Sequence, residues 1–159
     1  MRIGTILLAL LLMPLALHAQ TPEDDVMAVV YNLFDGMRTS DSTLVKNQFT
    51  ENAVMMTAMP NGVNQGNVDG FAAWVGSEKT FIANEQIWDS EVRIDGELAT
   101  AWTPYAFYAS DQFSHCGANS FQFAKTAEGW KITSIIDSRR RDDCDVPAAY
   151  QPGGDKHRQ

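Results

Sequence analysis

Apolar side chains recur at helical spacing near the start of the chain. They fall at i, i+3, i+4, i+7, i+8 and i+11 and form one stripe: Val26, Val29, Val30, Leu33, Phe34 and Met37. Thr21 precedes Pro22 and a pair of acids, a composition that caps a helix and complements its dipole. The pattern predicts a helix that begins near Glu23 and buries one face. A short second helix is expected after Asp41.

Beyond the second helix the pattern changes to strands. Residues 53–59 predict a first strand, residues 60–67 a glycine-containing loop, and residues 68–79 a third helix. Four strand-like segments follow, separated by hairpin signals, at 85–94, 98–108, 113–125 and 130–138. Consecutive strands after three helices favour an α+β fold, in which the helices pack on one face of a curved antiparallel sheet.

The first 19 residues have the pattern of an export signal. Arg2 precedes an apolar run, and the residues up to Ala19 suit cleavage by a signal peptidase. We expect the mature chain to start at Gln20; an uncleaved anchor is the alternative. One domain over residues 20–144 and a flexible tail over 145–159 would follow. The expected location is secreted or periplasmic.

Charge narrows the choice of partners. The sequence has 12 Lys and Arg against 20 Asp and Glu, a formal net charge of −8. Such a surface does not attract phosphate backbones or anionic lipids. We therefore expect neither nucleic acid nor a membrane as a partner.

The chain has two cysteines, Cys116 and Cys144. An even pair in an exported protein most often forms a disulfide, which here would close a loop of about 27 residues. Adjacent His115 and Cys116 point to opposite faces of a strand, so we expect neither a metal site nor a cysteine nucleophile. No cofactor is indicated.

The order of these elements resembles the nuclear transport factor 2-like superfamily, which includes SnoaL-like polyketide cyclases and ketosteroid isomerase. The local marks are the stripe of the first helix, the passage from Ser40 to Val54, and the final strand beginning Gly129-Trp130-Lys131-Ile132. The segment from His115 to Cys144 is further similar to an exported bacterial subgroup. The resemblance covers about residues 24–140 and implies a cone with a pocket between helices and sheet.

The resemblance also implies where polar groups would lie. In the isomerase branch, the general base maps near Thr57, the tyrosine of the first helix near Leu33, and a second acid onto Asn119. Two of these groups are absent and the third is an amide. Steroid-isomerase chemistry is therefore not expected.

Strand alternation gives the remaining candidates. If Asn119 faces the pocket, then His115, Gly117, Phe121 and Phe123 share its face. His115 becomes the candidate for proton transfer, because imidazole titrates near neutral pH; a purely structural or ligand-contacting histidine is the alternative.

Asp137 near the end of the last strand is a second tentative catalytic residue. It could orient His115, grip a polar ligand together with Arg139, or form a salt bridge that closes the last strand. The candidate ligand-binding residues are Trp102, Asn119, Phe34, Trp74 and Arg139, and Trp102 is placed nearest the pocket by analogy with the isomerase branch.

The first functional hypothesis is an exported protein that binds a small, partly apolar molecule. The second is a cyclase, dehydratase or isomerase that uses His115. The third is a non-catalytic dimerisation module, which requires an apolar outer sheet face and a filled cone. A homodimer through the outer sheet face is expected, with Ile135 and Phe107 placed on that face.

Overall fold

The computed structural model describes residues 20–157, and the expected signal segment lies outside this range. Helix α1 (Pro22–Thr39) begins as its sequence predicts. The Thr21 hydroxyl accepts a hydrogen bond from the Asp24 amide at 3.2 Å, and the Asp24 carboxylate accepts one from the Thr21 amide at 2.8 Å. This capping box satisfies two amides that the first helical turn leaves open. The apolar stripe of α1 is buried.

Two shorter helices lie beside the end of α1. Helix α2 (Ser42–Lys46) is capped by Asp41, whose carboxylate accepts from the Leu44 amide at 2.8 Å. Helix α3 (Val68–Gly76) is capped by Asn67 in the same manner. Val45 of α2 and Val75 of α3 are fully buried, so both helices add to the apolar core.

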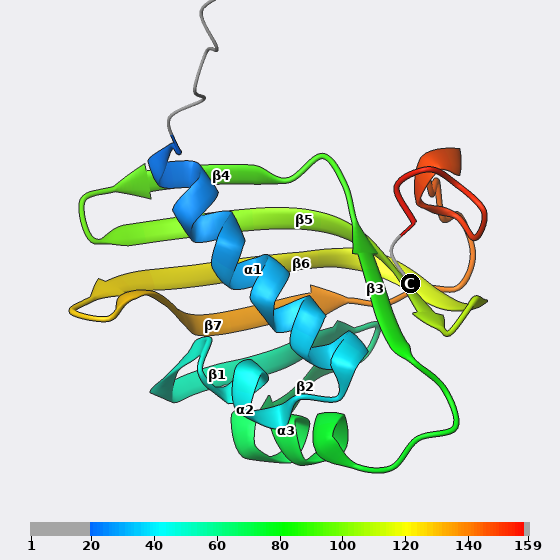
Figure 1. Ribbon diagram of the computed structural model, residues 1–159, viewed down its shortest axis with the longest axis horizontal. Coiled ribbons are helices and arrows are strands. Elements are labelled where there is room, and N and C mark those ends of the chain that lie inside the picture. Colours follow the sequence, from blue (N-terminus) through cyan, green and yellow to red (C-terminus); the bar gives the residue numbers. More distant parts are fainter. Residues whose placement is uncertain (1–19, 158–159) are drawn as a thin grey trace, which may run out of the picture.

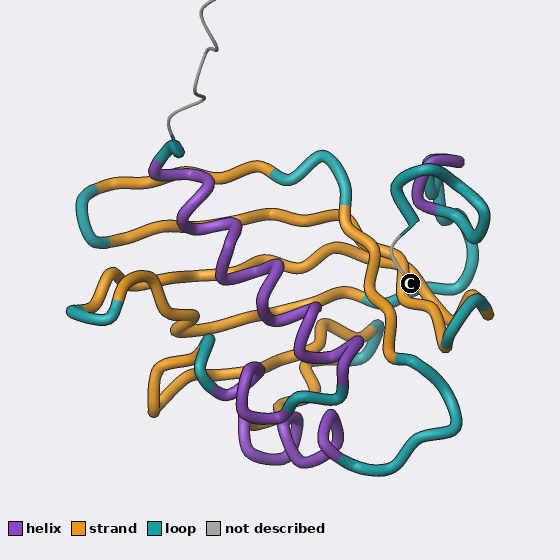
Figure 2. The backbone as a smooth tube through the Cα atoms, in the orientation of Figure 1, coloured by secondary structure: helices purple, strands orange, loops and turns teal. Residues whose placement is uncertain are grey.

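A curved, unclosed sheet of seven strands forms the other layer (Figure 1). Its strands are β1 (Phe49–Met59), β2 (Gly62–Asn67), β3 (Ala83–Ile87), β4 (Glu91–Asp95), β5 (Leu98–Ala109), β6 (Gln112–Thr126) and β7 (Gly129–Ser138). They pair in the order β2-β1-β7-β6-β5-β3, and β4 also pairs with β5. Helix α1 crosses one face of this sheet, and the path of the backbone is followed most easily in Figure 2. The predicted α+β fold is confirmed.

Three details of the sheet differ from the sequence prediction. Strand β1 pairs with β7 in parallel, so the sheet is mixed and not wholly antiparallel. Most of residues 60–67 form strand β2 and not a loop, because this segment folds back on β1 as a hairpin. Hydrogen bonds to β1 stabilise it as a strand, although its own sequence has no strand pattern. Residues 85–94 form two strands, separated near Asp89, which has a left-handed φ of 44°. That turn lets β3 and β4 pair with different ends of β5.

The tail after β7, for which we expected loose chain, packs against the sheet in its described part. The predicted disulfide between Cys116 and Cys144 is present, with the two Cα atoms 5.9 Å apart. Tyr150, in a single 3₁₀ turn (Ala148–Tyr150), packs on Trp88 with ring centroids 5.7 Å apart. The His157 side chain is only 1% exposed and lies edge-on to Tyr108. These contacts cover the outer face near β3 and β5.

Across residues 20–157, no helix is long and apolar enough to span a membrane. The core lies between α1 and the inner sheet face, where Phe121 and Phe123 of β6 are fully buried. Phe34 of α1 meets Phe121 edge to face at 6.4 Å. Strand alternation had placed both β6 rings on the inner side, and the structure confirms it.

Candidate ligand-binding site

The core does not fill the concave side of the sheet. A cavity of about 490 Å³ remains between α1, α3 and the strands, a size common for small-molecule sites. One wall is apolar and comes from α1, β1 and α3; it includes Leu33, Met37, Met55, Met56 and Phe71. The opposite end is polar and comes from the middle of the sheet. The cavity is therefore amphipathic.

The polar end is one row of residues across four strands. The registers pair Thr57 of β1 with Asp137 of β7, Asp137 with Asn119 of β6, and Asn119 with Thr103 of β5. Because side chains at paired positions point to the same face of a sheet, the row gathers distant residues at one place. Asn119, Thr103 and Asp137 are all buried.

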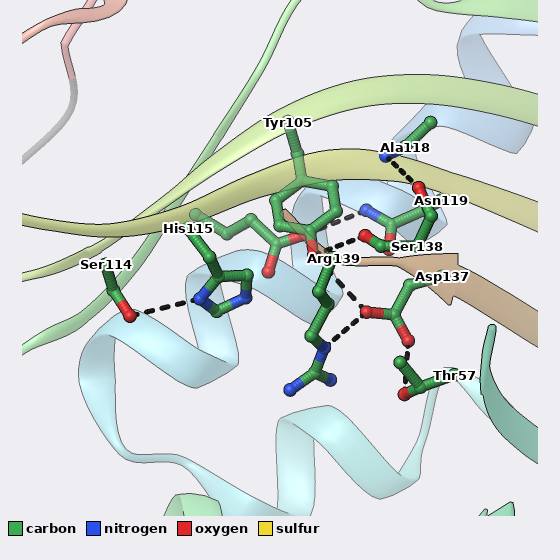
Figure 3. A network of polar contacts seen from close by, with 10 residues as sticks. Thr57, Tyr105, Ser114, His115, Ala118, Asn119, Asp137, Ser138 and Arg139 are labelled. Carbon is green, nitrogen blue, oxygen red and sulfur yellow. Dashed lines mark hydrogen bonds and ion pairs between the residues drawn. The ribbon is translucent and has the colours of Figure 1, made fainter. Parts of the chain in front are cut away.

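Asp137 is the most connected member of this row (Figure 3). Its carboxylate accepts hydrogen bonds from the Thr57 hydroxyl at 2.7 Å, the Tyr105 hydroxyl at 3.3 Å and Arg139 Nε at 2.6 Å. Of the alternatives for Asp137 and Arg139, the structure therefore contains an ion pair, which lines the cavity. The Arg139 side chain remains about half exposed, at 53%.

Gly117 permits this arrangement. Its backbone passes so close to β7 that a Cβ atom there would lie 1.8 Å from the Ser138 carbonyl oxygen. That same oxygen accepts a hydrogen bond from the Tyr105 hydroxyl at 3.0 Å. Burial and the nearby carboxylates raise the pKa of Tyr105 well above its ordinary value, so its hydroxyl stays a hydrogen-bond donor.

The sequence-predicted site residues mostly meet in this cavity. His115, Asn119, Asp137, Arg139, Phe34 and Trp74 all line it. Trp102 does not: it is 51% exposed on β5, and the placement nearest the pocket was wrong. Trp102 is three positions from Tyr105, and residues an odd number apart point to opposite faces of a strand. Tyr105 is the residue that faces the cavity.

His115 has the expected orientation but a different environment from the one expected. Its ring stacks on Phe107 at 5.2 Å and meets Tyr105 edge-on at 5.7 Å. Burial, followed by the charge of Arg139, lowers its pKa to about 4. Within the described chain it contacts the Ser114 hydroxyl and is not hydrogen-bonded to Asp137. His115 is therefore a neutral and weakly basic group at pH 7.

Glu85 on β3 is a cavity residue that the sequence does not single out. Its Oε1 atom accepts a hydrogen bond from Asn119 Nδ2 at 2.8 Å, and the carboxyl group lines the cavity. Burial raises the pKa of Glu85 to about 7; the Asn119 bond opposes this shift and Asp137 adds to it. The signal for it is strand alternation: Glu85 is two residues from both Ala83 and Ile87, which face the core, so its side chain lies on the same face.

The polar end does not resemble a metal centre. Among residues 20–157 there is no group of three or more His, Cys, Asp or Glu side chains that could hold an ion. Cys116 is bonded to Cys144 and faces away from the cavity. What the arrangement offers is hydrogen bonding and a carboxyl group that titrates near neutral pH.

No protein-family model matches the sequence, and no protein of curated function matches it significantly. Solved structures do match. A protein from Shewanella baltica, described as NTF2-like and of unknown function, superposes with a TM-score of 0.60 at 17% identity, covering 76% of this chain and 94% of its own. This chain has the NTF2-like fold.

Two further NTF2-like structures agree. One from Novosphingobium aromaticivorans, with a cystatin-like fold, has a TM-score of 0.62 at 14% identity over 80% of this chain and 84% of its own. One from Streptomyces avermitilis, proposed to be a dehydratase, has a TM-score of 0.59 at 16% identity. The match covers 76% of this chain and 99% of that protein. At sequence identities this low, the similarity to these structures shows a common fold and nothing about function.

The raised pKa of Glu85 has a measurable consequence for stability. Between the ordinary value of 4.5 and about 7, the folded protein holds a proton that the unfolded chain has lost. The free energy of unfolding should therefore fall as pH rises through this window, by about 3 kcal/mol in all, and then level off. Denaturant unfolding of wild type and Glu85→Gln at pH 5 and pH 8 measures this.

In Glu85→Gln, the part of the decrease in unfolding free energy between pH 5 and pH 8 that is due to Glu85 should disappear, because an amide does not titrate. Glu91→Gln is the matched control, since Glu91 is exposed on β4. A decline with pH that is the same in all three proteins would contradict the prediction.

Proposed function

We propose that this protein binds a small, partly apolar molecule in the cavity between α1 and the sheet. The observation that carries the proposal is the 490 Å³ cavity, with an apolar wall at one side and hydrogen-bonding groups converging at the other. An apolar body gains free energy by leaving water, and a few fixed polar groups orient it. The NTF2-like fold alone supports no particular ligand.

The mouth of the cavity suits a ligand of this kind. Trp74 of α3 lies there, 39% exposed and stacked on Phe71 with ring centroids 5.9 Å apart. Asn64 of β2 and Asn67 before α3 also line it. A bound molecule would therefore pass between an aromatic pair and two amides before reaching the polar row.

A proton-transfer enzyme is the second candidate. The observation in its favour is that Glu85, with a pKa of about 7, can both take and give a proton at neutral pH. His115 is less suited than the sequence suggested, because its pKa of about 4 makes it a weak base. The proposed dehydratase activity of the Streptomyces avermitilis protein is compatible with this candidate but belongs to that protein.

The third candidate, an assembly module without a ligand, has less support because it requires a filled cone. A homodimer through the outer sheet face remains a proposal. Ile135 and Phe107 cannot form that interface, since both line the cavity on the inner face. Trp102 is an exposed apolar residue on the opposite side of β5 and is the better anchor.

Export from the cytoplasm is also part of the proposal. The Cys116–Cys144 disulfide supports it, because disulfides persist mainly in oxidising compartments. The signal-like segment 1–19 supports it from the sequence.

The binding proposal can be tested by blocking the cavity. We expect 1-naphthalenemethanol, a neutral and mostly apolar probe, to bind and to raise the melting temperature. Met55→Trp, on the same face of β1 as Thr57, places a ring in the cavity and should weaken binding at least about tenfold, a loss of about 1.4 kcal/mol. Met59→Trp is the matched control, because Met59 is 51% exposed on the same strand. Calorimetry that detects no binding to wild type, either of this alcohol or of the amine of the same shape, would refute the proposal.

The enzyme candidate is tested with His115→Gln and Glu85→Gln. In a binding protein, His115→Gln should change affinity by about 1 kcal/mol, the value of one hydrogen bond. In an enzyme, losing the acid–base group should lower turnover roughly 10²–10⁴-fold with little change in binding. If the protein turns over a carbonyl compound, we expect Glu85→Gln to lower the turnover rate more than His115→Gln does. A larger loss in His115→Gln would restore histidine as the proton-transfer group.

The state of the exported protein can be checked on material recovered from the export compartment. Its intact mass should correspond to a chain that begins at Gln20 and retains the disulfide. Light scattering should give twice that mass, and Trp102→Glu should give the monomer mass because it places a charge in an apolar interface. A retained segment 1–19 would rule out cleavage, and a monomeric wild type would rule out the dimer.

A further inference from the structure

The Glu85 carboxyl lacks a cation of its own. Within residues 20–157, the bond from Asn119 to Oε1 is the hydrogen bond that this carboxyl accepts, which leaves Oε2 for another donor. The basic side chains that line the central cavity are those of His115 and Arg139, and the Arg139 Nε atom is bonded to Asp137. A carboxylate that lines a cavity, largely removed from water and without a cation, is costly to ionise, and a cation placed beside it would lower that cost.

The positive and negative charges of the other groups near Glu85 largely balance. In the central cavity, Asp137 and Arg139 neutralise each other and His115 is neutral at pH 7. Glu85 also lines a second cavity of about 330 Å³, at the side of β3 next to the tail. The titratable groups that face it there are Tyr31, Asp35, Arg38, Tyr150, Asp155, Lys156 and His157. Asp35 pairs with Arg38, and Asp155 and Lys156 have opposite charges. Ionised Glu85 therefore gives the central cavity one net negative charge.

Aromatic rings form much of the cavity lining around this charge. Phe34, Phe71, Trp74, Tyr105 and Phe107 all contribute to it. The faces of such rings attract cations, most strongly where water is excluded. Rings together with a carboxylate provide the two components that hold an ammonium group, while the apolar wall holds a hydrocarbon body.

We propose that the ligand is an apolar amine, bound as its cation, with the ammonium group against Glu85 and its hydrocarbon part against α1 and α3. This inference rests on the proposed function and names the ligand class. An anion is disfavoured, because it would meet ionised Glu85. A neutral alcohol fits the cavity but leaves the Glu85 charge without a partner.

The proposal predicts a proton linkage. Glu85 must lose its proton to pair with an ammonium ion, and the proton goes to the buffer. With a pKa of about 7, half of the molecules carry that proton at pH 7, so binding should release about half a proton per ligand. Amine affinity should rise about tenfold from pH 6 to pH 8, as Glu85 becomes ionised.

The test compares two probes of nearly the same shape, 1-naphthylmethylamine and 1-naphthalenemethanol, by calorimetry on the full mature chain. At pH 8 the amine should bind roughly 10- to 100-fold more tightly than the alcohol, the range of a hydrogen bond to a charged group. Repeating the pH 7 titration in buffers of different ionisation enthalpy measures the released proton directly. This readout uses wild-type protein and needs no variant.

Glu85→Gln should bring the amine to the affinity of the alcohol and abolish its proton release and its pH dependence. Glu91→Gln on β4 should behave as wild type. Equal affinities for the two probes at pH 8, or an amine that binds without proton release at pH 7, would overturn the inference and leave the proposed function standing. If neither probe binds, the proposed function itself fails.

Discussion

The polar end of this protein depends on the carboxylate of Asp137. It accepts hydrogen bonds from Thr57 on β1, Tyr105 on β5 and Arg139 just after β7, so it joins parts of the chain up to 80 residues apart. The parallel pairing of β1 with β7 places Thr57 beside Asp137, and without that pairing the row across the sheet would lose its first member. These three donors fix the orientation of the Asp137 carboxylate, and none of them comes from His115.

Glu85 is the second carboxyl group that lines the cavity. Asn119 lies next to Asp137 in the register and donates to Glu85, so the same row that satisfies one carboxylate holds the other in place. The two acids have different partners: Asp137 is paired with a guanidinium, whereas the carboxyl group of Glu85 is largely removed from water and is hydrogen-bonded to an amide. The difference explains why the pKa of Glu85 rises to about 7. The site thus combines a titratable carboxyl group with an apolar wall, which are the two features on which the proposed function rests.

Much of this could be predicted from local pattern. Helix α1, its cap and the inward face of β6 follow from spacing and alternation, and the disulfide follows from cysteine count and compartment. Alternation also determines two placements that the sequence prediction has wrong: Ile135 is two residues from Asp137 and shares its face, and Trp102, three residues from Tyr105, lies on the opposite face from it. Glu85 and β2 depend on pairing with distant or weakly patterned segments, and local sequence does not encode such pairing.

The central claim is that Glu85 carries a proton at mildly acidic pH and ionises near neutrality inside an otherwise charge-balanced cavity. Carbon-13 NMR of the Glu85 side-chain carboxyl, assigned by comparison with Glu85→Gln and followed from pH 4 to pH 9, measures this directly. We expect a titration midpoint for Glu85 at a pH of about 7. A midpoint at the ordinary glutamate value near 4.5 would contradict it.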